Sequence, residues 1–289
     1  MITAKPINFD KDMNQILSLI KNDLDSTFNE EFFIWKHLEN PFGKSFAMGA
    51  WDTDKLVGLR MFMRWEFMGS NNELVKAIRP VDTVTHSEYR GKGIFKSLTL
   101  KGLELTKSEY DIVFNTPNQN SLPGYLKMGW DKIKFNQSFI YAIVNPFSTK
   151  SNDIFFTGYF NDLEIDKHNV GETYLSKDYL RWRYKEKSFC FAHDSNQTLV
   201  VYKAGKFRGL KTIMVYETCG ENKKISNIIS AIASKEKTII FYGFFGNRTK
   251  YLNFKFVFKR NMPVVVWRDD SKSIHQKLSF SLGDLEGKL

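Results

Sequence analysis

The sequence predicts a protein of the α/β (α+β) class, in which helices flank a mixed, mostly antiparallel sheet and a second, related domain follows the first. Three observations predict this fold class. The composition, with 42% hydrophobic and 26% charged residues, is that of a globular protein. Helical and strand periodicities alternate through the first half of the chain. Several short segments of the first half recur in the second.

The first half opens with an amphipathic helix and continues with three strands. Apolar residues from Met13 to Leu24 recur at the 3.6-residue spacing of a helix, with Asp10 or Asp12 as candidate caps. Three stretches rich in β-branched and aromatic residues follow, separated by polar turns. We expect these strands at residues 46–51, 56–65 and 74–85. In this order they predict an antiparallel meander.

A glycine-containing turn at residues 90–93 connects the third strand to a second helix, which begins near Ile94 and leads to a short strand at 110–114. The first N–H groups of a helix are unpaired and lie at the positive end of its dipole. Glycines let the backbone approach an anion closely, and Arg90 and Lys92 add positive charge. The turn is therefore a candidate phosphate site, although two glycines also suit an ordinary turn.

The second half of the chain repeats segments of the first half. Three pairs of similar segments are present: 33–37 and 180–184, which contain Trp35 and Trp182, and two pairs that begin at Gly58 and Gly209 and at Tyr125 and Tyr251. The last two landmarks are 67 residues apart in the first half and 42 in the second. We therefore predict a duplication into residues 1–147 and 148–289, in which the second copy has no room for the glycine turn and its helix. Chance similarity between aromatic-rich segments is the alternative.

The net charge of +10 is concentrated in the second half. Residues 1–146 contain 18 basic and 17 acidic side chains, and residues 147–289 contain 24 and 15, a difference of +9. Such a field favours an anionic partner, for example a nucleotide-bearing cofactor, an acidic carrier protein, nucleic acid or an anionic lipid surface. A lysine-rich surface without a partner is the plainer explanation. Because no recognition motif accompanies the charge, nucleic acid is not expected.

The remaining composition indicates a cytoplasmic protein. The longest apolar stretches are far shorter than the ~18 residues of a membrane span, and the first residues do not resemble a signal peptide. Cys190 and Cys219 fit no common zinc or redox spacing, so we expect two reduced thiols and no metal. The sequence sets no oligomeric state.

Two motifs resemble the GNAT superfamily of acyl-CoA-dependent N-acyltransferases. The segment from Arg90 to Phe95 matches the family's Arg/Gln-x-x-Gly-x-Gly/Ala signature, except that Phe95 replaces its small last residue. The family's second motif is matched by Asn118, by Tyr125 seven residues later, and by Gly129-Trp130. With its degenerate second copy, the chain is similar to the tandem-domain branch of the superfamily.

The resemblance implies a GNAT fold, with a catalytic domain and a GNAT-like second domain. It also implies acetyl-CoA or another acyl-CoA as co-substrate, and transfer of the acyl group to a primary amine of a small molecule, such as an amino sugar or a nucleotide-linked amino sugar. Tyr125 would be the general acid for the departing thiolate. A backbone N–H group from residues 84–86 would polarise the carbonyl. The implied cofactor-binding residues are Val84, Thr85, His86, Arg90, Gly91, Lys92, Gly93, Ile94, Phe95, Asn118 and Ser121.

The general base is less well defined by the sequence. By the alternation of a strand, Asp82 lies on the same face as Val84 and His86. Either Asp82 or His86 is a candidate to accept the amine proton, and both also fit structural roles. Glu88, in the turn, is expected to be solvated.

Two alternative functions follow from the same residues. Phe95 and Pro123-Gly124, which precedes Tyr125, depart from the family pattern. These departures, and the lack of one clear base, would suit a regulatory protein that binds the cofactor without turnover. The basic second half would also suit an acyl group delivered on an acidic carrier protein. Its charge disfavours a polycationic acceptor.

Overall fold

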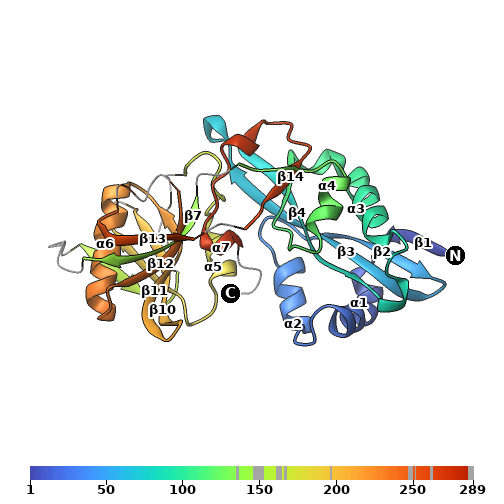
Figure 1. Cartoon of the computed structure of the whole chain (residues 1–289), viewed down its shortest axis with the longest axis horizontal. Coiled ribbons are helices and arrows are strands. Elements are labelled where there is room, and N and C mark those ends of the chain that lie inside the picture. Colours follow the sequence, from blue (N-terminus) through green and yellow to red (C-terminus); the bar gives the residue numbers. More distant parts are fainter. Residues whose placement is uncertain are drawn as a thin grey trace. The chain divides into compact units, whose positions relative to one another are not determined.

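The computed structural model describes residues 1–134, 137–145, 153–160, 165, 168–195, 197–246, 250, 252–260 and 263–285. They form two compact units, each built on a seven-stranded sheet (Figure 1). The first unit comprises Met1–Phe67, Leu74–Ile133 and Val264–His275. The second unit comprises Met68–Glu73, Lys134–Pro263 and Gln276–Leu289.

The first sheet has the order β1-β2-β3-β4-β5-β14-β6. Its strands are β1 (Ile2–Pro6), β2 (Phe46–Asp52), β3 (Lys55–Met68), β4 (Leu74–Thr85), β5 (Ile112–Asn115), β14 (Val266–Arg268) and β6 (Asp131–Lys132). β4 and β5 pair in parallel, whereas β1–β2, β2–β3, β5–β14 and β14–β6 are antiparallel. The predicted meander is thus present, and β4 has the bounds expected from the sequence.

Helices pack on this sheet through two separate apolar clusters. The helical elements are α1 (Phe9–Asp23), α2 (Glu30–Phe33), η1 (Ile34–Leu38), η2 (Ser70–Asn72), η3 (Ser87–Tyr89), α3 (Ile94–Leu105), η4 (Lys107–Glu109) and α4 (Leu122–Lys127). One cluster packs α3 and α4 on the sheet, and the other contains the buried residues of α1. A Cβ on Gly58 of β3 would lie 2.6 Å from Ile94, so this glycine lets the start of α3 approach the sheet closely.

The cap of α1 differs from the one expected. The side chain of Asn8 accepts hydrogen bonds from the N–H groups of Asp10 and Lys11. The helix therefore begins at Phe9, and Asp10 and Asp12 lie in its first turn, where a carboxylate interacts favourably with the dipole.

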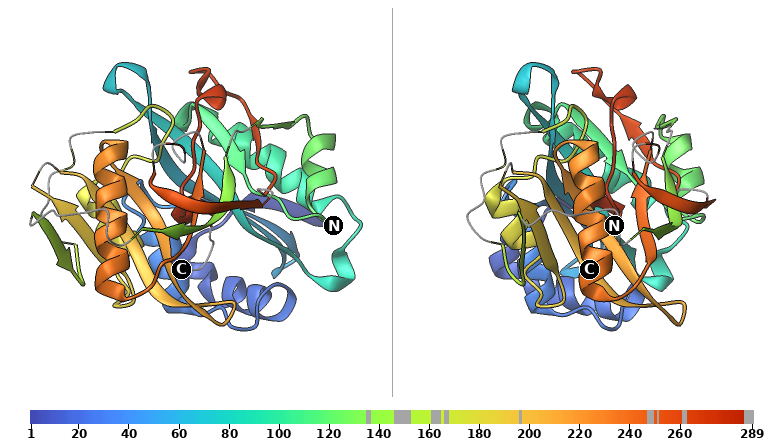
Figure 2. Two further views of the ribbon diagram at one scale, coloured as in Figure 1. Left: turned by 60° about the vertical axis from the view of Figure 1, so that its left-hand side comes forward. Right: turned by 90° about the vertical axis from the view of Figure 1, so that its left-hand side faces the viewer.

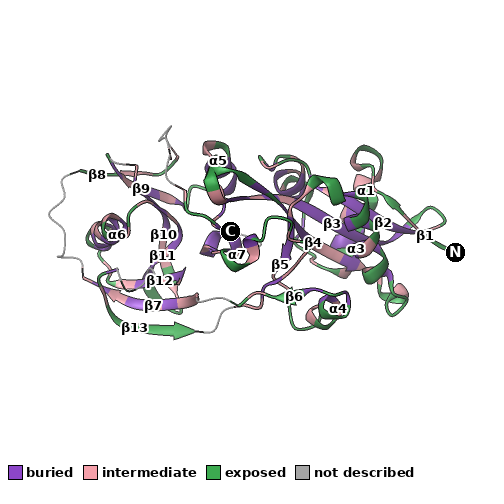
Figure 3. Ribbon diagram, turned by 90° about the horizontal axis from the view of Figure 1, so that it is seen from above, coloured by how far each residue is buried: buried purple, intermediate pink, exposed green. Residues whose placement is uncertain are grey.

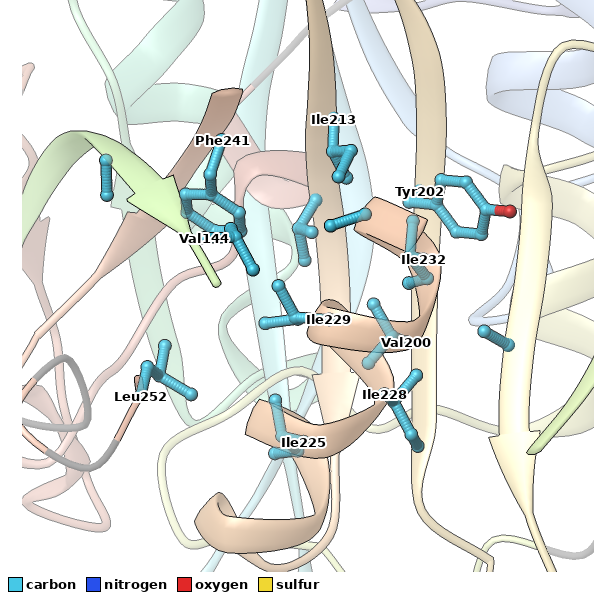
Figure 4. Packing of buried hydrophobic residues seen from close by; sticks show 14 of the residues in the cluster. Val144, Val200, Tyr202, Ile213, Ile225, Ile228, Ile229, Ile232, Phe241 and Leu252 are labelled. Carbon is cyan, nitrogen blue, oxygen red and sulfur yellow. The ribbon is translucent and has the colours of Figure 1, made fainter. Parts of the chain in front are cut away.

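The second sheet has the order β13-β7-β12-β11-β10-β9-β8. Its strands are β7 (Ser138–Val144), β8 (Ile154–Thr157), β9 (Cys190–Asp194), β10 (Leu199–Phe207), β11 (Leu210–Cys219), β12 (Ile240–Phe245) and β13 (Phe254–Arg260). The helical elements of the C-terminal half are α5 (Lys177–Arg183), α6 (Asn222–Glu236), η6 (Ile274–Gln276) and α7 (Leu282–Leu285). α6 lies along one face of the sheet (Figure 2), where Ile225, Ile229 and Ile232 pack against strand residues (Figure 4).

The two sheets have the same strand order when the second is read from β8. In each, one pair is parallel, β4–β5 in the first sheet and β11–β12 in the second. In each, the next strand comes from the other half of the sequence. β14 lies between β5 and β6, and β7 lies between β12 and β13. The two halves therefore exchange one strand reciprocally.

This exchange moves the boundary between the units away from the predicted one. Position 147 lies outside the described residues, but the chain already enters the second unit at Lys134. Ile140, Ala142 and Val144 of β7 are buried in the core of the second unit, which explains why this segment belongs there.

The landmarks used to align the two halves are only partly equivalent. The segments around Trp35 and Trp182 both lie on a helical element directly before the second strand of a sheet. Gly58 lies within β3, however, whereas Gly209 lies in the turn between β10 and β11. Tyr251 is outside the described residues. The prediction that the second copy lacks room for a helix is wrong, because α6 has 15 residues.

Burial follows the two sheets. Buried residues concentrate in the central strands, whereas β13 is largely exposed (Figure 3). Both cysteines are free thiols, as expected. Within the described part of the chain, no helix is long and apolar enough to span a bilayer.

Candidate active site

The loop between β4 and α3 presents an open backbone surface. Gly91 and Gly93 have φ angles of +78° and +74°, in the region that favours glycine, and a Cβ at either position would meet no atom within 4 Å. α3 begins directly after Gly93 without a side-chain cap. The first N–H groups of this helix therefore face space that an anion can occupy. This geometry fits the pyrophosphate of an acyl-CoA.

Charged side chains on this loop are held at the surface. The Arg90 guanidinium lies 3.5 Å from the carboxylate of Asp23 and donates to the carbonyl of Thr85 at 3.2 Å. The Lys92 ammonium lies 4.5 Å from the ring centre of Tyr89. The Tyr89 hydroxyl donates to the carboxylate of Asp52 at 2.7 Å. Two positive charges therefore flank the glycines, as the sequence predicted.

β4 and β5 part next to this loop. Their parallel pairing consists of Ala77 with Ile112 and Ile78 with Val113, after which β4 continues to Thr85 without β5 beside it. The N–H group of His86 donates to the carbonyl oxygen of Val57 on β3 at 2.9 Å. Since successive N–H groups of a strand point to opposite sides, the N–H of Thr85 points away from β3. Of residues 84–86, Thr85 best fits the predicted role of polarising a carbonyl.

Tyr125 lies at the end of this opening with its side chain 1% exposed. Its hydroxyl oxygen accepts hydrogen bonds from Arg60 Nη2, at 2.6 Å, and from Asn115 Nδ2. Arg60 comes from β3 and also donates to Thr83 on β4. A phenol oxygen that accepts two hydrogen bonds still has its own proton to donate. Both donors also stabilise the phenolate that would remain after proton transfer.

The two departures from the family pattern pack against each other. The ring of Phe95 meets that of Tyr125 edge to face at 5.5 Å and lies 5.1 Å from the Arg60 guanidinium. A Cβ on Gly124 would lie 2.8 Å from the Phe95 ring, so this glycine makes room for it. Pro123 lies in the first turn of α4, where its missing N–H group costs the helix no hydrogen bond. The bulk of Phe95 therefore supports Tyr125.

Asp82 belongs to a buried ionic network. It has a φ of +43° within β4, which marks a local irregularity of the strand. Its carboxylate accepts from Lys36 Nζ at 2.9 Å, and its other oxygen lies 2.8 Å from His37 Nε2. The second ring nitrogen of His37 lies 2.9 Å from the Ser45 hydroxyl. All four side chains are at least 85% buried.

The electrostatics of this network disfavour Asp82 as a base. Burial alone would raise the pKa of Asp82, but the Lys36 ammonium and the His37 hydrogen bond outweigh it and hold the pKa below its ordinary value. Burial lowers the pKa of His37, and Asp82 only partly offsets this effect. His37 is therefore neutral, donates from Nε2 to the carboxylate and accepts the hydroxyl proton of Ser45.

His86 is the more accessible of the two candidate bases. Its Nδ1 accepts from the N–H of Glu88 at 3.4 Å, and its Nε2 lies 3.2 Å from Lys55 Nζ. The side chain is 23% exposed, compared with 15% for Asp82, and Glu88 is largely solvated, as expected. His86 thus combines exposure with a place at the start of the loop.

The remaining predicted cofactor residues have local structural roles. The side-chain oxygen of Asn118 accepts from the backbone and hydroxyl of Ser121, which fixes the entry to α4. The side chain of Val84 is buried in the α1 cluster, so only its backbone is available to a ligand.

Sequence reasoning missed the polar partners of the site, namely Lys36, His37, Ser45, Arg60, Thr83 and Asn115. One signal was present. Arg60 is a charge within the apolar run of β3, and a buried guanidinium requires acceptors. Its partner on α4 follows from no local pattern. Among the described residues, no cluster of three or more His, Cys, Asp and Glu side chains is arranged to hold a metal ion.

Comparisons with known proteins agree with this geometry. Residues 4–133 match the family model of the acetyltransferase (GNAT) domain, and the match ends where the chain leaves the first unit. A search of curated protein sequences finds no match.

Several solved structures resemble the whole chain. A probable N-acyltransferase from Enterococcus faecalis, described as a conserved protein of unknown function, has a TM-score of 0.70 at 12% identity over 93% of this chain and 72% of that chain. A GCN5-related N-acetyltransferase from Anabaena variabilis has 0.70 at 10% identity, with the same coverage. Eis1 from Mycobacterium abscessus has 0.68 at 9% identity, covering 93% and 73%. At such identities the likeness concerns the fold, which extends over both units. The predicted fold class and resemblance are confirmed.

Proposed function

Since the first unit of this chain is a GNAT acetyltransferase domain, and the chain an acyltransferase enzyme, we propose that it transfers an acetyl or other acyl group from acyl-CoA to a primary amine of a small molecule. The observation that carries this proposal is the placement of Tyr125. Its hydroxyl lies where β4 and β5 part and accepts hydrogen bonds from Arg60 and Asn115. The open glycine loop directly precedes α3, whose Phe95 packs against the Tyr125 ring.

The chain's own residues supply three of the functions that acyl transfer needs. Bound acyl-CoA supplies a thioester whose carbonyl carbon a neutral amine attacks. The loop at 90–93 and the start of α3 bind the phosphates. The N–H of Thr85 stabilises the negative charge that develops on the carbonyl oxygen. Tyr125 gives its proton to the thiolate sulfur, and Arg60 and Asn115 stabilise the phenolate left behind.

The amine must lose a proton before or during attack. We propose that His86, directly or through water, accepts it, because Asp82 is already held as an anion by Lys36 and His37. Asp82 then acts as a positioning residue that fixes the irregularity of β4. If His86 accepts the proton, His86→Gln should lower kcat while acetyl-CoA still binds, and a variant with the full rate of the wild type would exclude the assignment.

Removal of the Tyr125 hydroxyl tests the proposed function. We expect Tyr125→Phe to fold and to bind acetyl-CoA, because the ring and its packing remain. Its rate of thiol release should fall by a factor on the order of 10², and the loss should appear in kcat rather than KM. Tyr202→Phe is the matched control, since it removes a buried hydroxyl from the second unit. Full activity of Tyr125→Phe would show that another group protonates the thiolate.

The acceptor is proposed to be a small amine with anionic character, such as a nucleotide-linked amino sugar. The excess of 24 basic over 15 acidic residues in the second half supports this class over a polycationic amine. An acyl group delivered on an acidic carrier protein is the second candidate, supported by the same charge. Thiol release measured with acetyl-CoA against neutral, anionic and cationic amines distinguishes these cases. Binding of acetyl-CoA without release to any amine would favour a regulatory protein.

One acyl-CoA per chain is expected. The loop at 86–93 in the first unit corresponds to residues 220–221 between β11 and α6, and Glu221 precedes that helix. A carboxylate at this place repels phosphates. The one glycine of the short loop, Gly220, is also not open, because a Cβ there would lie 3.0 Å from Thr198. Isothermal titration with acetyl-CoA should give a stoichiometry of one. Two bound molecules would contradict a second unit without a cofactor site.

A further inference from the structure

The second unit contains a cavity of about 360 Å³ at the point where β11 and β12 part. Parallel pairing of these strands ends at Val215 and Gly243, and the residues beyond this point line the cavity. The segment 276–284 closes another side. Every lining residue belongs to the second unit. The cavity therefore occupies the place in the second sheet that corresponds to the opening between β4 and β5 in the first.

Glu217 lines this cavity with only 4% of its surface exposed. One carboxylate oxygen, Oε1, accepts from the hydroxyls of Tyr184 at 2.6 Å, Ser281 at 2.9 Å and Tyr179 at 3.5 Å. Within the part of the chain that the structure describes, Oε2 has no hydrogen-bond donor, and no Lys, Arg or His forms an ion pair with this carboxylate. Burial makes this carboxyl group costly to ionise, and a cation bound beside Oε2 would stabilise its charged form.

The rest of the lining suits an organic cation. Four aromatic residues line the cavity, and the face of an aromatic ring attracts a cation. The four residues are Tyr216, Phe244, Phe245 and Phe280. Three carboxylates line the cavity, those of Glu172, Glu217 and Asp284, against one ammonium group, that of Lys134. This excess of negative charge disfavours an anion such as the phosphates of acyl-CoA.

We propose that this cavity binds a small organic ammonium ion, whose N–H group donates to Oε2 of Glu217 and whose charge lies against the aromatic rings. A volume of about 360 Å³ is within the usual range for small-ligand sites. The site is separate from the acyl-transfer site, and the proposal holds whether or not Tyr125 acts as the acid.

Titration of the full chain with n-propylammonium chloride, followed by methyl NMR, tests the proposal. We expect saturable shifts with a Kd of about 1 mM, a value reasonable for so small a ligand. The shifts should concentrate at the methyl groups of Leu175, Val215 and Leu278, which line the cavity. The methyl groups of Ile16 and Leu98 in the first unit should stay in place. Potassium chloride at equal ionic strength is the control for salt effects.

The variant Glu217→Gln should weaken binding at least tenfold, and Glu221→Gln, at an exposed position of the same unit, should not. Unchanged affinity in Glu217→Gln would overturn the proposal. If that variant does not fold, the wild-type titration still decides. Shifts that do not saturate, that appear equally with potassium chloride, or that acetyl-CoA produces at the same methyl groups would overturn it as well.

Discussion

Asp82 and Glu217 are buried carboxylates on β4 and β11, the corresponding strands of the two sheets, and their environments are opposite. Asp82 is paired with Lys36, and its pKa is held below the ordinary value even though burial acts to raise it. Glu217 is surrounded by hydroxyls, and burial together with the charge of Asp284 raises its pKa well above the ordinary value. Asp82 is thus ion-paired directly with a lysine, whereas the described residues that donate hydrogen bonds to Glu217 are hydroxyls, and Arg183 offsets the burial of this carboxyl group only in part.

The difference shows how one topology serves two purposes. In the first unit, the network of Asp82 is complete without a ligand, so it can fix β4 beside the catalytic opening. In the second unit, Glu217 is left with an oxygen that no described residue satisfies. The loops before α3 and α6 also differ in charge at the residue that precedes the helix, which is Gly93 in the first unit and Glu221 in the second. We therefore propose an anion site at the loop of the first unit and a cation site in the cavity beside Glu217, although the second half as a whole is basic.

The largest effect should come from neutralising each carboxylate in turn. Asp82→Asn leaves the Lys36 ammonium, 10% exposed, without its partner, and should lower the free energy of unfolding by about 3–5 kcal/mol. Glu217→Gln should cost only about 1 kcal/mol, because the amide resembles the protonated carboxyl group that the raised pKa favours. Urea denaturation at pH 7 measures both. Equal losses would remove the contrast between the two sites.

A second test compares two glycines with the same backbone conformation. Gly93 and Gly209 have φ angles of +74° and +83°, and a Cβ would meet no neighbour at either position. Gly93→Asp places a carboxylate at the phosphate site, so acetyl-CoA affinity should fall on the order of 10²-fold. Gly209→Asp introduces similar strain in the β10–β11 turn and should leave the affinity unchanged. A similar loss in both variants, seen by calorimetry, would mean that strain and not charge is responsible.

The smallest effect is a difference in pH dependence. Because the pKa of Glu217 is raised in the folded state, the folded chain binds more protons than the unfolded chain above about pH 4.5, and this group's contribution to stability falls as pH rises. For Asp82 the sign is reversed, since its pKa is lowered and its contribution is lost only in acid. The stability of the wild type relative to Glu217→Gln should therefore decline from pH 5 to 8, by at most about 1.4 kcal/mol per pH unit. Parallel curves for the two proteins would contradict the shift.

Local sequence patterns predicted the strands and the glycine turn of the first unit. The β-branched and apolar residues from which the strand at 74–85 was predicted also make β4 a largely buried strand, and the glycine turn before Ile94 has the conformation that glycine favours. The ion pair between Lys36 and Asp82 joins residues 46 positions apart, and nothing in either segment specifies it. The same holds for Arg60 and Tyr125. Such contacts depend on how elements pack, which periodicity does not encode.

The second unit was predicted less well for a related reason. Matching aromatic segments correctly paired the regions before β2 and β9, without predicting the helical elements there. Counting residues between Gly209 and Tyr251, however, treated a turn as a strand position. The loss of length actually lies in shorter strands and a shorter loop, since β10 and β11 have 9 and 10 residues where β3 and β4 have 14 and 12. Strand length is set by packing across a sheet rather than by one landmark.

The reciprocal strand exchange also determines when the acyltransferase can be completed during synthesis. Trp267 pairs with Phe114, and β6 joins the first sheet only through β14. Until the ribosome has delivered Val266–Arg268, the edge of β5 beside Asn115 has no partner there, although everything that forms the loop and Tyr125 has long been translated. Completion of the sheet that holds the proposed acyl-transfer site therefore waits for nearly the whole chain. A chain truncated before Val266 lacks β14 and therefore cannot complete the first sheet.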